Sequence, residues 1–518
     1  MELILLPLTR FLFGGLSIAT GKASRLFAVL ALAVDGILLG RLAAALAANA
    51  PVELVLGGWS RGFGIAFTGD RIGLTFAALV WGLGVAVLLY TWKDTLRPYF
   101  FMLLHLLIGA SYALTTTGDL FNAYVILELL TLTSFLLVGY ERKPSQIWAS
   151  LRYLILCSLG MSLFLLGIAV VYYHTGTLDL VEVAAHVASG STAPWIRLAA
   201  ALLTTGVAVK AGIFLFSLWL PAAHARAIPA VSALLSGVVI KMGVVELFRL
   251  SAIFPLDLTF IVLGFATGFL GIVYAIQTRD AKRLLAFSTL AQIGYLLIGF
   301  GAGSEAARLG ALDYAVAHGL FKALLFLAVG EASKLVGGSD LRTLILHRDR
   351  IPRTTRVALI VGVLGIVGMP PFAGFAAKAV LESCLHPTTF HAAVALISVG
   401  TVVSFAKLIP LLRGRTSGRT ETTRAVAYGW LGGGVVLFLP LSAAMLPRSL
   451  LATTWGWSAY VEAAAVILIG LGLYRLVRRR PFRLPDRIFR IEEATLVILA
   501  GFFLVFWLVH LGWPASCG

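Results

Sequence analysis

The chain has 518 residues, of which 59% are hydrophobic and 13% are charged, and its mean hydropathy is +0.95. This composition excludes a soluble globular protein, since apolar runs of about 20 residues recur along the whole length. The formal net charge of +17 does not indicate nucleic-acid binding, because the basic residues gather in short segments between those runs. We expect an all-α polytopic membrane protein that binds no nucleic acid.

The apolar runs, taken in chain order, predict about 14–16 transmembrane helices. The candidate spans lie at residues 3–20, 25–48, 70–92, 98–116, 121–140, 150–173, 196–220, 229–250, 256–277, 284–301, 310–335, 356–380, 389–412, 427–446, 458–477 and 493–512. The first span is expected to remain in the mature protein, because it lacks a basic start and an A-x-A exit. The longest loops, at 49–69 and 336–355, are too short to hold a soluble domain.

Basic residues crowd into alternate loops between these spans. The loops lie near residues 22–25, 93–97, 142–143, 279–283, 342–356, 413–424 and 475–490. The positive-inside rule assigns such loops to the cytoplasmic side of a bacterial-type plasma (inner) membrane, so both termini are expected on the non-cytoplasmic side. The segment at 475–490 is expected to anchor the chain at the cytoplasmic surface, and docking of a partner subunit or of anionic lipid is the alternative.

A few ionisable residues lie inside the predicted spans. Glu128 is near the middle of an apolar run, where a charged side chain costs about 2.5–3.5 kcal/mol on insertion scales. Four lysines lie in later spans, and His318 precedes one of them by four residues, which places both on one helix face. The lysines are Lys210, Lys241, Lys322 and Lys378. Burial disfavours the charged form of an amine and a nearby carboxylate restores it, so these residues predict a proton path, with static ion pairs as the alternative.

Other charged residues lie near predicted span ends. We expect these side chains to reach the membrane interface along their own apolar stems. They are Arg10, Arg41, Arg152, Glu246 and Lys334.

Prolines interrupt two spans beside buried lysines. Pro221 and Pro229 follow Lys210, whereas Pro370 and Pro371 precede Lys378. Proline removes an amide donor, and a broken membrane helix is tolerated where protein or a water-filled cavity satisfies the freed groups. Two broken spans, five spans apart, predict two structural repeats of inverted topology.

No motif for catalysis, cofactor binding or metal binding is apparent. The three cysteines, Cys157, Cys384 and Cys517, are far apart in the sequence and have no metal-ligand spacing. The chain has neither a phosphate-binding loop motif nor a haem or iron–sulfur spacing. We expect no cofactor and no metal site, and leave open whether the chain is a subunit of a proton-translocating oxidoreductase.

Six motifs together resemble the antiporter-like membrane subunits of respiratory complex I, membrane-bound hydrogenases and Mrp cation/proton antiporters. They are FTGDRIGLTFAALVWGLGVAVLLY, GDLFNAYVILELLTLTSFLLVGY, KAGIFLFSLWLPAAHARAIPAVSALLSGVVIKMGVVELFR, AKRLLAFSTLAQIGYLLIGFG, AHGLFKALLFLAVGE and GMPPFAGFAAK. They follow one another in the family's order over about residues 65–412. GDLFNAYV and SGVVIKMG look most like the D-type subunit of Mrp antiporters.

The resemblance implies a fourteen-helix core with two inverted five-helix repeats, spans 4–8 and 9–13, and two broken helices. It also implies that Glu128 pairs with Lys210, that Lys241 lies between two half-channels and that Lys378 is the exit-side carrier of the second half. His318 and Lys322 would lie on the hydrophilic axis between them. Two further residues, His224 and Lys407, are accessory candidates. Because Arg226 follows His224 and departs from the family pattern, a structural role for His224 is the alternative.

The predicted organisation has four parts. They are N-terminal helices at 1–97, a first repeat at 98–250, a second repeat at 256–412, and C-terminal helices with a basic loop at 413–518. The predicted function is that of a proton-translocating subunit of a multi-subunit cation/proton antiporter or energy-converting respiratory or hydrogenase complex. Its expected partners are other membrane subunits, the lipid bilayer and protons, with sodium or potassium as candidate exchanged ions. Alternatives are a proton-coupled subunit for inorganic-carbon uptake, a quinone-linked oxidoreductase subunit, and a structural subunit that does not conduct.

Overall fold

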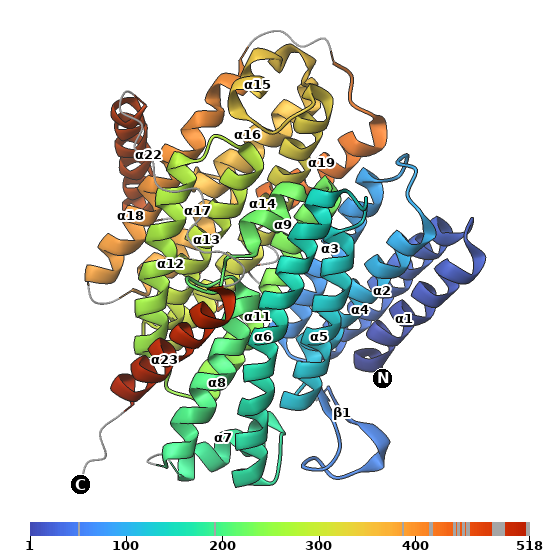
Figure 1. The fold of residues 1–518 in the computed structure, drawn as a ribbon, viewed down its shortest axis with the longest axis vertical. Helices are drawn as coiled ribbons and strands as arrows, with labels where there is room; N and C mark the ends of the chain where they lie inside the picture. The colour runs from blue at the N-terminus through green and yellow to red at the C-terminus, as the bar shows by residue number, and fades with distance from the viewer. Residues whose placement is uncertain are drawn as a thin grey trace.

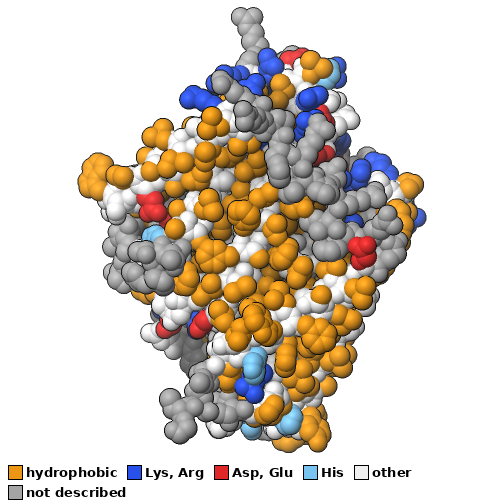
Figure 2. All heavy atoms as spheres, turned by 60° about the vertical axis from the view of Figure 1, so that its left-hand side comes forward, with side chains coloured by type: hydrophobic (Ala, Val, Ile, Leu, Met, Phe, Trp, Pro, Cys, Tyr) orange, Lys and Arg blue, Asp and Glu red, His pale blue; other side chains and the backbone are white. Residues whose placement is uncertain are grey.

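The computed structural model describes residues 1–49, 52–190, 193–385, 388–413, 418–438, 442, 446–447, 451, 456–478 and 493–513. Within these ranges the chain is almost entirely helical, and 13 helices are long and apolar enough to cross a membrane. This confirms the prediction of an all-α polytopic membrane protein. Figure 2 shows the corresponding surface, with hydrophobic side chains across the middle of the face and Lys and Arg side chains gathered towards its upper end. The predicted basic segment at 475–490 and the predicted span at 427–446 lie partly outside the described residues.

Three helices and a short hairpin form the N-terminal part of the bundle. They are α1 (Glu2–Thr20), α2 (Ser24–Ala47), β1 (Glu53–Val55), the 3₁₀ turn Leu56–Gly58, β2 (Ala66–Thr68) and α3 (Arg71–Tyr90). The two strands are antiparallel, with Leu54 opposite Phe67. Phe67 also bridges to Thr117, so the hairpin is tied to the turn that follows the fourth helix.

Two consecutive groups of helices form the centre of the bundle. The first group is α4 (Pro98–Thr116), α5 (Leu120–Val138), α6 (Pro144–Thr175), α7 (Leu180–Ser189), α8 (Pro194–Ala211), α9 (Leu220–Arg226), α10 (Pro229–Leu234), the π-helical segment η2 (Leu235–Val239) and α11 (Ile240–Ile253). The second group is α12 (Asp257–Gln277), α13 (Ala281–Phe300), α14 (Glu305–Val336), α15 (Leu341–Leu346), the 3₁₀ turn Arg348–Arg350, α16 (Arg353–Val367), α17 (Ala373–Ser383), α18 (Thr388–Phe405) and η4 (Ala406–Leu412).

The two groups repeat the same backbone features. Asp119 caps α5 and bridges to Asp179, which caps α7; Asp280 caps α13 and bridges to Asp340, which caps α15. Both α6 and α14 have 32 residues, and each ends at a glycine in the left-handed conformation, at positions 176 and 337. The second set lies 161 residues after the first in every case (119 and 280, 179 and 340, 176 and 337). A capping carboxylate and a left-handed glycine are local signals that start and stop a helix, so the same signals build both repeats.

The repeats are inverted with respect to each other. Figure 1 shows α7 at the lower end of the molecule and α15 at the upper end, although each follows the long third helix of its repeat. This confirms the predicted inverted topology.

Both broken spans end their first half at a left-handed glycine. Gly212 has φ 71° at the end of α8, and Gly368 has φ 80° at the end of α16. Pro370 and Pro371 lie in the break between α16 and α17, as predicted, whereas Pro221 and Pro229 occupy the first turns of α9 and α10. A first helical turn tolerates proline since its amides have no intrahelical partner. The glycines therefore terminate the half-helices.

Three further described helices follow the repeats: α19 (Thr422–Val436), α22 (Trp457–Val477) and α23 (Ala494–Gly512). In Figure 1, α22 stands at the outer edge of the bundle beside α18. Only 6% of the most apolar stretch of α22 is buried, whereas the corresponding stretch of α14 is 100% buried. The core is therefore centred on α14, and α22 lies at its rim.

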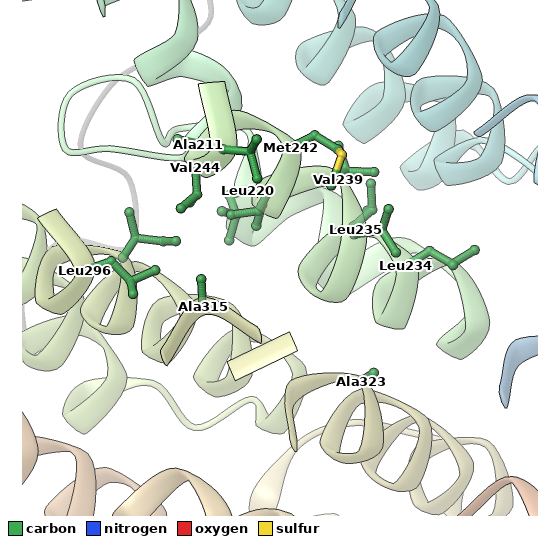
Figure 3. Packing of buried hydrophobic residues seen from close by; sticks show 14 of the residues in the cluster. Ala211, Leu220, Leu234, Leu235, Val239, Met242, Val244, Leu296, Ala315 and Ala323 are labelled. Carbon is green, nitrogen blue, oxygen red and sulfur yellow. The ribbon is translucent and has the colours of Figure 1, made fainter. Parts of the chain in front are cut away.

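Close packing brings the π-helical segment against α14. Figure 3 shows the segment that carries Leu235, Val239 and Met242 beside α14, on which Ala315 and Ala323 lie. At this contact a Cβ atom on Gly237 would lie 3.3 Å from the Gly319 carbonyl oxygen, and one on Gly319 would lie 3.2 Å from the Gly237 carbonyl oxygen. The two glycines let the backbones approach closely beside His318.

Candidate functional site

Glu128 and Lys210 come from α5 and α8 of the first repeat. Lys210 is 2% exposed, and its amine donates to the carbonyl oxygen of Leu127, the residue directly before Glu128, at 3.2 Å. Glu128 is half-buried and lies within electrostatic reach of the amine, but these two described residues form no ion pair within 4 Å. The implied pairing stays a prediction, and the Lys210 amine is bound to the backbone directly before Glu128.

Lys241 lies in the first turn of α11, directly after the π-helical segment. Its amine donates to the Ser236 carbonyl oxygen at 2.8 Å and lies 2.6 Å from Nδ1 of His318 on α14. A π-helical turn widens the helix by one residue and leaves carbonyl groups available, and such turns are frequent at functional sites. Here it provides the carbonyl that binds the lysine.

His318 and Lys322 lie on one face of α14, as their spacing predicted, and both are fully buried. The amine of Lys322 donates to the Leu285 carbonyl oxygen at 2.6 Å and to the Ser288 hydroxyl, both on α13. It also lies 5.9 Å and 5.7 Å from the ring centres of Phe326 and Phe405. The lysine is therefore held by neutral oxygens and aromatic rings.

Lys378 lies in α17, after the break in the second repeat. Its amine donates to the Ser398 hydroxyl at 3.2 Å and to the Ile366 carbonyl oxygen at 3.4 Å, and it lies 5.7 Å from the centre of the Tyr295 ring. The Tyr295 hydroxyl in turn donates to Glu382 at 2.7 Å. The carboxylate of Glu382, one turn after Lys378, was missing from the sequence-based set, although the i,i+4 spacing was a signal for it.

A chain of polar and aromatic side chains connects His318 with the surroundings of Lys378. The Tyr314 ring is stacked near His318 at 6.4 Å between centres and lies 4.8 Å from the Tyr295 ring. The Tyr314 hydroxyl donates to Gln292, whose amide donates to Thr401 at 3.0 Å. Polar groups thus continue from the centre of the bundle into the second broken helix.

His224 is fully buried in α9 and stacks on Phe326, with ring centres 4.5 Å apart. Neither of its ring nitrogens forms a hydrogen bond with the part of the chain that the structure describes. Lys322, Lys241 and Lys282 are the charged residues that act on it electrostatically. The Phe326 ring also lies near the Lys322 amine, so His224 and Lys322 share one aromatic neighbour.

Lys407 caps a helix. Its amine donates to the carbonyl oxygens of Ala275, Ile276 and Thr278 at 2.6, 3.1 and 2.8 Å. These carbonyls belong to the C-terminal end of α12, where the helix leaves its acceptors without intrahelical donors and its dipole is negative. This geometry fits a structural role better than a role in proton transfer.

A buried cluster in the N-terminal helices corrects one expectation from the sequence. Arg10 is 1% exposed and does not reach the interface; its guanidinium donates twice to Asp35 on α2, once at 2.7 Å. Tyr112 on α4 donates to the same carboxylate oxygen at 2.7 Å, and His105 lies 3.3 Å from Arg10. Asp35 on α2 neutralises and hydrogen-bonds the guanidinium, so Arg10 is buried although it lies near the end of a predicted span.

Glu246 also differs from the expectation that it reaches the interface. Its side chain is fully buried and lies 3.6 Å from Arg249, which donates to the carbonyl oxygens of Leu114 and Thr115 at 2.6 and 2.9 Å. These carbonyls end α4. The pair therefore joins α11 to α4. Arg41 and Lys334, by contrast, are 69% and 62% exposed, in agreement with the prediction.

A cavity of about 840 Å³ opens at the end of the bundle that carries the predicted cytoplasmic loops. Its lining is rich in charged side chains, and it reaches Ala225, the neighbour of His224. The charged lining residues are Asp94, Arg97, Glu141, Arg142, Lys143, Arg226, Lys282 and Lys334. Water therefore has access from this end to the region of the first broken helix.

The fold and the buried residues define a polytopic membrane protein with a line of lysines through two inverted repeats. The family model described as "NADH:quinone oxidoreductase/Mrp antiporter, TM" matches residues 117–404. The chain belongs to this family, as the sequence motifs predicted.

Named relatives and solved structures agree with this assignment. The D-type subunit of the Na(+)/H(+) antiporter of Alkalihalophilus pseudofirmus is 29% identical over 423 residues, which are 79% of this chain and 85% of that protein. The N-type subunit of the NADH-quinone oxidoreductase of Desulforudis audaxviator is 30% identical over 416 residues, 76% and 81% of the two chains. A chain of the Mrp complex from Dietzia sp. DQ12-45-1b has a TM-score of 0.80 at 24% identity, covering 98% of this chain and 60% of that one. A chain of the archaeal membrane-bound sulfane sulfur reductase has a TM-score of 0.77 at 23% identity, covering 90% and 98%. These two structures share the fold.

Proposed function

We propose that the protein moves protons across the membrane as one subunit of a larger complex, either a cation/proton antiporter or an energy-converting respiratory or hydrogenase complex. Glu128, Lys210, Lys241, Lys322 and Lys378 are the proton-transfer residues of this proposal, together with His318. Its family relatives, named as an antiporter subunit and as a quinone oxidoreductase subunit, support both kinds of complex.

The contact between Lys241 and His318 carries the proposal. Lys241 belongs to the first repeat and His318 to the second, and their nitrogens are 2.6 Å apart in a fully buried position. Ionisable groups are costly inside a membrane protein and mark proton relays by default. A direct hydrogen bond between two titratable groups at the junction of the repeats supports one continuous path through both.

The charged cavity near His224 supplies the entrance in this proposal. The loops around it carry the basic residues, which favours the cytoplasmic side by the positive-inside rule. In Figure 1 the N-terminus and β1 lie in the lower half of the molecule, away from α15 and its basic loop. This arrangement supports a non-cytoplasmic N-terminus.

Exposed apolar helices support assembly with other membrane subunits. The most apolar stretches of α1 and α22 are 33% and 6% buried. Such surfaces are covered by lipid or by neighbouring helices in a membrane. The proposed partners are therefore other membrane subunits that pack along these edges of the bundle.

The test measures proton movement in vesicles that contain the whole assembled complex, followed with a fluorescent pH probe. Lys241→Ala should reduce the rate about tenfold or more, because it removes one member of the direct contact between titratable residues of the two repeats. Lys22→Ala, which removes a lysine in a basic loop far from this contact, is the matched control and should keep the wild-type rate. Wild-type flux in Lys241→Ala, at normal amounts of assembled complex, would refute the proposed path.

A further inference from the structure

The surroundings of Lys378 include α22, a helix that follows the two repeats in the chain. A small cavity of about 20 Å³ lies where α17, α18 and α22 meet, and Lys378, Glu382, Ser398 and Glu462 are among its lining residues. A cavity of this size has room for one water molecule, which needs two to four polar partners. Lys378, the two carboxylates and the Ser398 hydroxyl are such partners.

Both carboxylates lie on the side of Lys378 away from the basic loops. The second broken span starts at Arg353, next to the basic turn Arg348–Arg350, and Glu382 lies one turn beyond Lys378 in the same direction. Glu462 is in the second turn of α22, whose last turn carries Arg475. The order from the centre of the bundle towards the non-basic surface is therefore Lys378, then Glu382 and Glu462.

The exposure of these groups increases in the same order. Lys378 is 6% exposed and Glu382 is half-buried. Glu462 is 38% exposed and lies 3.9 Å from His391 of α18, which is itself 36% exposed. The remaining titratable group that touches Glu382 is Tyr295 of α13, whose hydroxyl donates to it at 2.7 Å. The series passes from a buried amine to a carboxylate that solvent reaches.

We infer that Glu382 and Glu462 form a two-carboxylate proton-transfer site that connects Lys378 to the non-basic surface, and that α22 is therefore part of the conduction path. This inference rests on the proposed function, since it extends the same line of residues to the surface. It assigns a role to a helix that stands at the rim of the bundle, where few of its residues are buried.

Each step moves a single proton. An N–H bond of the Lys378 ammonium breaks, and the proton passes through the cavity water to a Glu382 carboxylate oxygen, leaving a neutral amine and a carboxylic acid. The Glu382 O–H bond then breaks as an O–H bond forms on Glu462, which releases the proton to water at the surface. The same steps run in reverse when the gradient is reversed. No other reactant is consumed.

A purely structural role for Glu462 is the competing explanation. The contact with His391 joins α22 to α18, and these helices also pack closely where a Cβ on Gly470 would lie 2.5 Å from Cβ of Val402. If Glu462 only holds α22 in place, the loss of His391 should have the same effect as the loss of Glu462. If Glu462 accepts protons, loss of its carboxylate should lower the proton flux and loss of His391 should not.

The experiment compares proton flux in vesicles carrying the assembled complex with wild type or one variant. Glu382→Gln and Glu462→Gln keep the size of the side chain and remove proton exchange, so each should lower the flux about tenfold or more. Glu462→Asp should keep part of the flux. Two controls should keep the wild-type rate: His391→Ala, which removes the contact between Glu462 and α18, and Glu305→Gln, which changes an exposed carboxylate at the start of α14.

Chemical rescue separates proton transfer from packing. In Glu462→Ala, added formate should restore part of the flux, because a small carboxylate can take the place of the missing group; formate cannot restore a lost helix contact. Wild-type flux in Glu462→Gln, or equal losses in His391→Ala and Glu462→Ala with no effect of formate, would overturn the inference. A wild-type complex without proton flux would instead refute the proposed function, so the two failures are distinguishable.

Discussion

The amine of Lys241 and Nδ1 of His318 lie 2.6 Å apart at the buried contact between α11 and α14. A hydrogen bond between two such nitrogens needs a proton on one and a lone pair on the other. The pair therefore excludes the state in which the lysine is an ammonium and the histidine is an imidazolium. The junction between the repeats therefore holds at most one excess proton, as expected of a group that receives a proton and passes it on.

The first prediction concerns His318 and Lys322 on α14. His318→Ala and Lys322→Ala should each reduce proton flux strongly, and the double variant should lose little more than the worse single variant. Residues that act as one unit are non-additive, because the first loss already interrupts the path. Flux in vesicles for the two single variants and the double variant provides the measurement. Mild and fully additive losses would place the bridge between the repeats elsewhere.

The second prediction concerns Glu128 and Lys210. Glu128→Gln should abolish proton-coupled activity and leave assembly intact, since it removes the charge that attracts the Lys210 ammonium and keeps the side-chain size. Glu128→Asp should keep partial activity, because the charge remains on a shorter side chain. The measurement is ion exchange or proton pumping at matched protein levels. A Gln variant with wild-type activity would contradict a switchable pair.

The third prediction tests whether Lys378 must release its proton. Lys378→Ala and Lys378→Arg should both stop transport, because the guanidinium group does not deprotonate in proteins. The arginine variant keeps the positive charge near Glu382 and serves as the matched control for electrostatics. If Lys378→Arg transports normally, a fixed charge is sufficient and relay through this amine is rejected.

The fourth prediction compares two ion pairs that join the same helices, α1 and α2. Asp35→Asn leaves the buried Arg10 without its carboxylate and should destabilise the protein by about 3–5 kcal/mol. Arg41→Ala removes the exposed contact with Glu2, for which at most about 1 kcal/mol is expected. Thermal unfolding of the purified protein in detergent provides the comparison. Equal melting temperatures for the two variants would show that the buried pair is not a structural anchor.

The fifth prediction distinguishes Lys407 from the lysines of the proposed path. Lys407→Met keeps most of the apolar stem and removes three hydrogen bonds to the end of α12. It should lower the melting temperature, while the complexes that assemble keep their proton flux. Lys378→Met, which makes the same chemical change, should stop the flux. Loss of flux in fully assembled Lys407→Met would assign this residue to the path.

The positions of the central ionisable residues were predictable from sequence because a charge inside an apolar run stands out. Asp35, like Glu128, is a carboxylate inside an apolar run. Its pairing with Arg10 depends on how α1 packs against α2, so sequence spacing does not predict it. Glu382 lies two residues beyond the end of the predicted span 356–380. It remains beside Lys378 because both residues lie on α17, four residues apart.

The contact between Lys241 and His318, which joins the two repeats, could not be predicted from the sequence. It requires the π-helical turn at Leu235–Val239 and the close approach of Gly237 to Gly319, which bring Lys241 against His318. A π-helical turn has no reliable sequence signature. A glycine in a membrane helix also does not by itself predict which other helix approaches it closely. The broken spans were predicted from proline, whereas the left-handed glycines proved to end the half-helices.

The corresponding helices α6 and α14 of the two repeats differ in their surroundings. They have equal length and matching end signals, yet 44% of the most apolar stretch of α6 is buried against 100% for α14. Much of α6 is exposed on the surface of the bundle, where many apolar side chains are compatible with the fold. In contrast, α14 carries Asp313, His318, Lys322 and Glu331 in the buried interior. The two repeats therefore match at the aspartates and glycines that start and end their helices, while the side chains between these positions differ with their surroundings.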